Sequence, residues 1–146
     1  MSERSGADGE RVIQVFGESS LEFTVDSPPE WARESLGRRS VGFECASGDW
    51  IEREYEALPA MAVLERVDLP GDTTHVQLES RDGYRACVPV AALVDAVIAL
   101  GDENGHPRFV SPAVIGPRAI KDLASIRPLS LDAPEDPEAY ERLPID

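Results

Sequence analysis

Lysine is almost missing from this sequence: Lys121 is the only lysine among 14 basic residues, against 28 acidic residues. The formal net charge at pH 7 is therefore −14. A surface of that sign repels DNA, RNA and anionic membranes, which argues against any function that depends on binding them. Two interpretations of the charge stay open, adaptation to a salt-rich cytoplasm and a basic partner. We favour the salt-rich cytoplasm of a halophilic archaeon, because the acids are spread along the whole chain.

Long apolar runs are missing as well. No stretch approaches the roughly 20 apolar residues that a membrane-spanning helix needs. The longest one, "PVAALVDAVIAL", is interrupted by Asp95. The N-terminal "MSERSGADGERV" lacks the apolar centre of a signal peptide. We therefore expect a soluble, cytoplasmic protein.

Cysteine and histidine are scarce, with two of each. In a cytoplasmic chain we expect Cys45 and Cys87 to be reduced thiols. Together with His75 and His106 they are too scattered to form a structural zinc site. The phosphate-loop, dinucleotide, nucleophile-elbow, H-E-x-x-H and C-x-x-C motifs are absent too. Carboxylates are so numerous that no pair of them stands out as a general acid and base.

Short segments with the period of a strand or a helix fill most of the sequence. Asp82-Gly83 predicts a two-residue hairpin turn, and Ser27 with Glu30 predicts a helix N-cap with a capping box. The expected strands are residues 11–17, 21–25, 40–45, 75–80, 84–90, 108–112 and 126–131, and the expected helical segments are 27–37, 58–67, 91–100 and 116–126.

This order predicts the α+β class with mixed β-sheets and short helices. The length of 146 residues suits one domain with a substantial core. We assign residues 11–131 to that domain, residues 1–10 to a disordered N-terminus, and residues 132–146 to an acidic, proline-rich, extended or mobile tail.

Cys45 ends a strand whose apolar side chains Val41 and Phe43 share its face. Two interpretations follow from these residues alone. Free cysteine is among the most buried residue types, so Cys45 can be an inert packing residue. It can also be a working thiolate, the form in which sulfur attacks or binds metal. Cys87 has no such pattern around it and is interpreted as packing.

Five segments between Phe43 and Leu131 resemble, in the same order, motifs of the molybdopterin-binding oxidoreductase domain with the sulfite oxidase-type fold. A further segment, "VFGESSLEFTV", is similar to the start of that domain, so the resemblance spans about residues 12–131. The five segments are "FECASGDW", "LPAMAVLERVDLPGDTTHVQLESRDGY", "VPVAALVDAVIALGDENG", "PRFVSP" and "GPRAIKDLASI".

The resemblance implies a molybdenum–molybdopterin cofactor with Cys45 as the protein ligand to the metal. It places Arg118 and Lys121 at the phosphate end of the cofactor and Arg108 near the pocket. Such a domain would transfer an oxygen atom or electrons to or from a small oxyanion or sulfoxide.

The sequence also departs from that family. The family's "H-G-x-P" is missing, since "NGHPRF" runs directly from Asn104-Gly105 to Pro107-Arg108, and Asp122 stands where the family has tryptophan. An alternative therefore stays open: a cofactor-free relative of the same fold that acts as a binding or scaffold module. Whether the chain is an enzyme is left open, and ion pairs with nearby carboxylates would account for the three cations equally well.

Overall fold

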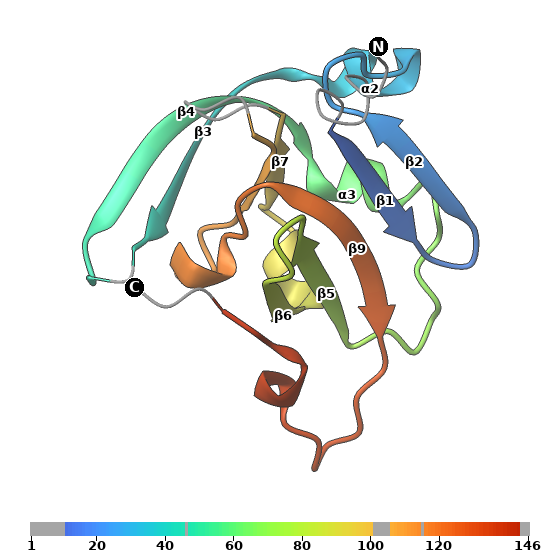
Figure 1. The fold of residues 1–146 in the computed structure, drawn as a ribbon, viewed down its shortest axis with the longest axis vertical. Helices are drawn as coiled ribbons and strands as arrows, with labels where there is room; N and C mark the ends of the chain where they lie inside the picture. Colours follow the sequence, from blue (N-terminus) through green and yellow to red (C-terminus); the bar gives the residue numbers. More distant parts are fainter. Residues whose placement is uncertain (1–10, 46, 101–105, 115, 144–146) are drawn as a thin grey trace.

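The computed structural model describes residues 11–45, 47–100, 106–114 and 116–143. Residues 1–10, for which the sequence predicts disorder, and the Asn104-Gly105 motif lie outside this set. Within it the chain forms two β-sheets with a few short helical segments between them (Figure 1). The α+β class with mixed sheets that the sequence predicts is confirmed.

The larger sheet has five strands in the order β2-β1-β9-β5-β6. β1 and β9 are parallel to each other, whereas the other neighbours in this sheet are antiparallel. The strands are β1 (Val12–Phe16), β2 (Ser20–Thr24), β5 (His75–Ser80), β6 (Arg85–Pro89) and β9 (Leu123–Leu129).

The smaller sheet is antiparallel, with the order β3-β4-β7-β8. Its strands are β3 (Gly37–Glu44), β4 (Trp50–Pro59), β7 (Val97–Ala99) and β8 (Arg108–Val110). β3 and β4 form a long hairpin that curves away from the rest of the chain, at the left of Figure 1. β3 is an edge strand of this sheet.

The helical segments are short and connect the strands. Residues Glu30–Ser35 form α2 and Ala60–Leu64 form α3, while the remaining segments are 3-10 turns. These turns are η1 (Val90–Leu93), η2 (Gly116–Arg118) and η3 (Pro137–Tyr140). None of the helices in the described residues is long and apolar enough to cross a membrane.

The strands β7 and β8 bury both of their faces. Leu58, Ile98 and Phe109 belong to the main core, which also takes in the larger sheet, α2 and α3. The alternate residues, among them Val97 and Val110, belong to a second cluster on the other face. That second cluster contains Val41, Phe43, Tyr55, Ala57, Val97, Ala99 and Val110. The smaller sheet therefore lies between two apolar clusters, one on each of its faces.

The helix predicted over residues 91–100 is wrong. Only Val90–Leu93 is helical, as the 3-10 turn η1, and Val97–Ala99 is strand β7. All three residues of β7 are buried, and a strand buried on both faces shows a continuous apolar run rather than alternation. Such a short run cannot be distinguished from a buried helix by its periodicity.

Other predicted boundaries change as well. No strand was predicted where β4 lies. On the face of β4 that carries its apolar side chains, the exposed Arg53 interrupts their alternation. α2 begins at Glu30 with Pro29 as N-cap and has no side-chain cap bond, so the capping box predicted at Ser27 is wrong. α3 is shorter than residues 58–67, since Leu58 and Pro59 end β4.

The predicted hairpin of β5 and β6 is confirmed, with Val76 opposite Val88. Its turn is one residue longer than predicted, because Ser80 N–H bonds to Tyr84 O at 2.9 Å and Gly83 N–H to Ser80 O at 3.1 Å. Gly83 has φ +93°, in the left-handed region that glycine adopts without steric cost. The helical turn with Pro117 is present as η2, but from Leu123 onward the predicted helical segment is strand β9.

The segment after Leu131 differs from the extended or mobile tail that the sequence predicts. Residues Pro137–Tyr140 form η3. Arg142 then pairs with Arg85 of β6 through two backbone hydrogen bonds of 2.8 and 2.9 Å. The described part of this segment therefore packs against the larger sheet.

Candidate functional site

Cys45 lies in the tight turn that joins β3 to β4. Its N–H bonds to Asp49 O at 2.8 Å and its carbonyl accepts from Gly48 N–H at 2.9 Å. Gly48 has φ +95°, which this turn needs and which side chains disfavour. The hydrogen bond to Asp49 extends the β3–β4 ladder by one pair, so Cys45 continues the alternation of Val41 and Phe43.

The thiol of Cys45 is partly exposed and hydrogen-bonded. Its Sγ lies 2.9 Å from Ser47 Oγ, and Asp49 Oδ2 lies 3.2 Å from the same hydroxyl, so the one proton of Ser47 can be donated to either acceptor. The hydrogen bond from Ser47, with help from nearby backbone N–H groups, lowers the pKa of Cys45. A partly exposed sulfur with a lowered pKa is available as a thiolate to an incoming metal or electrophile.

Arg108 lies at the start of β8 and is buried, with 8% of its surface exposed. Its Nε donates to Ala119 O at 3.0 Å, and its guanidinium carbon lies 5.0 Å from the centre of the Phe43 ring. Since Phe43 precedes Cys45 by two residues on the same strand face, the fold brings Arg108 to the face on which Cys45 lies.

Lys121 is next to Arg108 in space through a backbone bridge between the two residues. Its side chain is exposed and takes part in none of the ion pairs between described residues. This cation therefore faces solvent.

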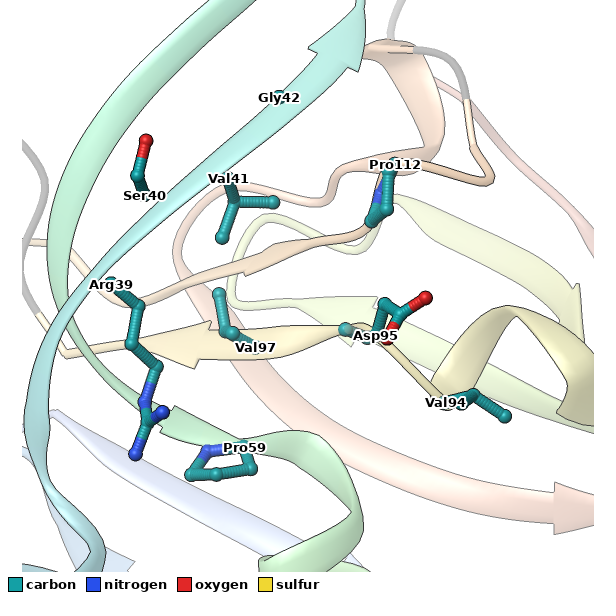
Figure 2. Close-up of a pocket in the computed structure, with 10 residues that line it drawn as sticks. Arg39, Ser40, Val41, Gly42, Pro59, Val94, Asp95, Val97 and Pro112 are labelled. Carbon is teal, nitrogen blue, oxygen red and sulfur yellow. The ribbon is translucent and has the colours of Figure 1, made fainter.

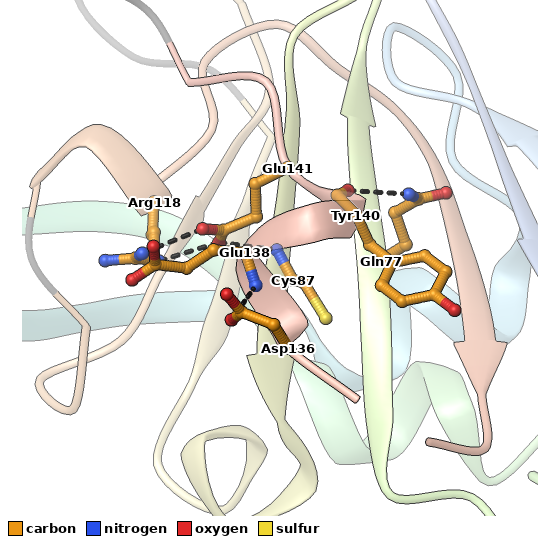
Figure 3. A network of polar contacts seen from close by, with 7 residues as sticks. All are labelled: Gln77, Cys87, Arg118, Asp136, Glu138, Tyr140 and Glu141. Carbon is orange, nitrogen blue, oxygen red and sulfur yellow. Dashed lines mark hydrogen bonds and ion pairs between the residues drawn. The ribbon is translucent and has the colours of Figure 1, made fainter. Parts of the chain in front are cut away.

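Arg118 is fully engaged by a carboxylate from the C-terminal segment. Its Nε and Nη2 donate to the two oxygens of Glu141 at 2.7 and 2.8 Å (Figure 3). Glu141 Oε2 also accepts from Cys87 N–H at 2.8 Å, and its side chain is only 5% exposed. The bidentate hydrogen bond to Glu141 raises the pKa of Arg118. Arg118 is therefore held in a bidentate ion pair, and no sequence signal identified Glu141 as its partner.

Cys87 is buried, as its interpretation as a packing residue requires. Burial, together with the Glu141 carboxylate, raises the pKa of the Cys87 thiol to about 11. Its sulfur therefore stays protonated at neutral pH.

A pocket of about 380 Å³ lies beside β3, away from the Cys45 turn. Figure 2 shows Arg39 and Val41 of β3 turned toward it, with Val97 on the opposite wall. Cys45, Arg108, Arg118 and Lys121 do not line it. In the part of the chain that the structure describes, no three His, Cys, Asp or Glu residues gather as a metal site.

No protein-family model and no curated protein matches this sequence. Among solved structures, the chain is similar to the sulfane dehydrogenase SoxCD from Paracoccus pantotrophus, with a TM-score of 0.68. The two are 18% identical, and the match covers 88% of this chain but 40% of the SoxCD chain. This likeness supports the fold that the sequence motifs predict. The chain spans less than half the length of the protein it resembles.

Proposed function

We propose that this chain is an oxidoreductase-type domain that binds a molybdenum–molybdopterin cofactor through Cys45. The observation that carries the proposal is the state of that thiol, which is partly exposed and has a lowered pKa. The likeness of the fold to a dehydrogenase supports it, as does the order of the sequence motifs.

The residues around Cys45 fit a soft metal bound through sulfur. A thiolate is the ligand type that such a metal prefers. Ser47 is within hydrogen-bond distance of the sulfur and can hold it in one orientation. Arg108 supplies positive charge on the same sheet face, and Lys121 is an exposed cation next to it. When bound, the cofactor supplies oxygen-atom or two-electron transfer, for which a small oxyanion or sulfoxide is the proposed substrate.

Arg118 fits the cofactor less well than the sequence motif implies. Its Nε and Nη2 both donate to Glu141. An anionic phosphate would have to displace a carboxylate that is already bidentate and buried. This observation favours the second candidate function, a cofactor-free binding module with the same fold.

Metal and pterin content separate the two functions. The protein should be produced in a host that makes the cofactor, purified at high salt, and analysed for molybdenum by mass spectrometry and for oxidised pterin by fluorescence. We expect both in the wild-type chain, and we expect Cys45→Ser to lose the metal while its circular dichroism is unchanged.

The matched control is Cys87→Ala, which removes the other cysteine and should retain molybdenum. A folded wild-type protein that contains neither molybdenum nor pterin would favour the binding module. Equal molybdenum in the wild-type and Cys45→Ser chains would instead remove Cys45 from the site.

A further inference from the structure

The carboxylate of Glu141 occupies a site with three N–H donors. Arg118 donates from Nε at 2.7 Å and from Nη2 at 2.8 Å, and the Cys87 N–H donates to Oε2 at 2.8 Å (Figure 3). A guanidinium fork with a main-chain N–H beside it is a donor set that binds phosphate groups as well as carboxylates. The site therefore has the chemistry of an oxyanion site, and a side chain of the protein itself fills it.

The C-terminal segment (residues 132–143), which brings Glu141 to this site, has few apolar contacts. Its residues are all exposed or partly exposed, and of these described residues only Leu143 packs against the main core. Hydrogen bonds hold the rest, among them two between Arg142 and Arg85 and one from Gln77 Nε2 to Tyr140 O. Water can replace such bonds when a segment leaves. An element with few buried apolar contacts opens at a lower free energy than the core of its domain.

Arg118 can be reached from solvent while this segment is in place. The Arg118 side chain is 26% exposed, whereas that of Glu141 is 5% exposed. Lys121 follows three residues later, so its Cα lies within about 11 Å of the Cα of Arg118, and its side chain is exposed. A ligand with two anionic groups has both cations nearby, whereas the single carboxylate of Glu141 pairs with Arg118. A phosphate group also carries more negative charge than a carboxylate.

We propose that the C-terminal segment closes an oxyanion site at Arg118 and Cys87, and that a ligand with a phosphate group binds there by displacing Glu141. The oxygens of the ligand accept the three N–H donors that Glu141 uses in the closed form, and the released carboxylate is hydrated. Because the ligand binds the open form, it shifts the population toward that form. The inference goes beyond the proposed function, since it requires neither Cys45 nor molybdenum and is tested on the chain without metal.

The first test measures the binding of inorganic pyrophosphate to the full chain by isothermal titration calorimetry, at an ionic strength held constant with sodium chloride. Glu141→Gln weakens the internal competitor. We therefore expect this variant to bind pyrophosphate about tenfold more tightly than the wild type, the factor that the loss of one charge-assisted hydrogen bond predicts. Glu138→Gln removes an exposed carboxylate of the same segment and should change the affinity much less. Glycerol phosphate in a parallel titration distinguishes an esterified phosphate from the free anion as the ligand.

The cation of the site is tested in a double variant. Arg118→Gln alone leaves the Glu141 carboxylate buried without its cation, which is strongly destabilising. Arg118→Gln combined with Glu141→Gln avoids this unpaired charge. We expect the double variant to fold and to lose the binding of both anions.

The second test follows the opening of the segment by limited proteolysis with chymotrypsin. Mass spectrometry measures cleavage after Tyr140, and a free peptide of residues 132–143 controls for effects of pyrophosphate on the protease. We expect cleavage to become about tenfold faster when pyrophosphate is present at about ten times the dissociation constant of Glu141→Gln, because the rate follows the population of the open form. The proposal is overturned if pyrophosphate slows this cleavage or leaves it unchanged. It is also overturned if Glu141→Gln binds no more tightly than the wild type, or if the double variant binds as Glu141→Gln does.

Discussion

The two cysteines of this chain lie in opposite environments. Cys45 is in a tight turn, where a hydroxyl and nearby N–H groups stabilise its thiolate. Cys87 is buried in β6 beside the Glu141 carboxylate, which disfavours a second negative charge. One residue type therefore has its thiolate favoured at one position and disfavoured at the other within a single domain.

Alkylation should separate them. With iodoacetamide at about pH 8, we expect mass spectrometry to find Cys45 modified in the folded chain and Cys87 modified only after denaturation, because the thiolate is the nucleophile. Equal rates for the two in the folded chain would contradict the assigned environments.

The raised pKa of Cys87 also has a consequence for stability. An unfolded thiol loses its proton near pH 9 and the folded one near pH 11, so stability falls as the pH rises through this range. Cys87→Ala should remove that part of the loss.

The sequence located Cys45 at the end of its strand but could not provide its surroundings. The turn residues Ser47 and Asp49 are close in sequence, and their contact with the sulfur depends on the turn conformation set by Gly48. Arg118 and Glu141 are 23 residues apart, and only the folded chain brings them together. Local patterns carry no signal for such a pair.

Elements with a clear period were the ones that the sequence predicted correctly. The hairpin of β5 and β6 alternates and has a glycine where the turn needs one. β7 gives no period, because both of its faces are buried. β4 alternates only in part, because Arg53 interrupts its inward face. The tertiary environment, rather than local preference, determines these two strands.

The C-terminal segment is held by a small number of polar contacts. Besides the pair of Glu141 and Arg118, Gln77 Nε2 donates to Tyr140 O at 2.8 Å (Figure 3). Tyr140 OH donates to Glu135 Oε2 at 2.7 Å. The apolar contribution of this segment is small, with Leu143 packed against the core. Its position therefore depends on these polar contacts, on the two backbone hydrogen bonds between Arg142 and Arg85, and on the buried carboxylate of Glu141.

Glu141→Gln should loosen this segment. The change removes the charge opposite Arg118, and charge-assisted hydrogen bonds contribute about 1.5–3 kcal/mol each. We expect faster proteolysis within residues 132–143 and a free energy of unfolding lower by about 1–2 kcal/mol. The control is Glu138→Gln, which removes an exposed carboxylate of the same segment and should have little effect. Identical proteolysis of the two variants would show that Glu141 does not anchor the segment.

At the scale of the whole molecule, both sheets contribute to the main core, and the smaller sheet has a second apolar cluster on its other face. The motif order was sufficient to predict the fold class, because it reflects which strands follow one another. It could not predict the curvature of the β3–β4 hairpin (Figure 1) or the pocket beside β3. Val41 and Phe43 of the hairpin belong to the same buried cluster as Val97 and Val110, which are more than 50 residues away in the sequence, and local patterns carry no signal for such contacts.

The net charge of −14 leads to a prediction about salt. Exposed carboxylates repel one another more in the folded chain than in the expanded unfolded chain. The Debye length falls from about 10 Å at 0.1 M salt to about 3 Å at 1 M, so added salt should relieve this repulsion. We expect the thermal midpoint, followed by circular dichroism, to rise with sodium chloride and to level off near about 1 M. Glycine betaine, which carries no net charge, controls for effects other than screening.

Replacing the exposed Glu52 and Glu56 by lysine should reduce the salt dependence, because it lowers the charge that salt has to screen. A midpoint that does not change with sodium chloride would exclude salt adaptation as the reason for the acidic composition.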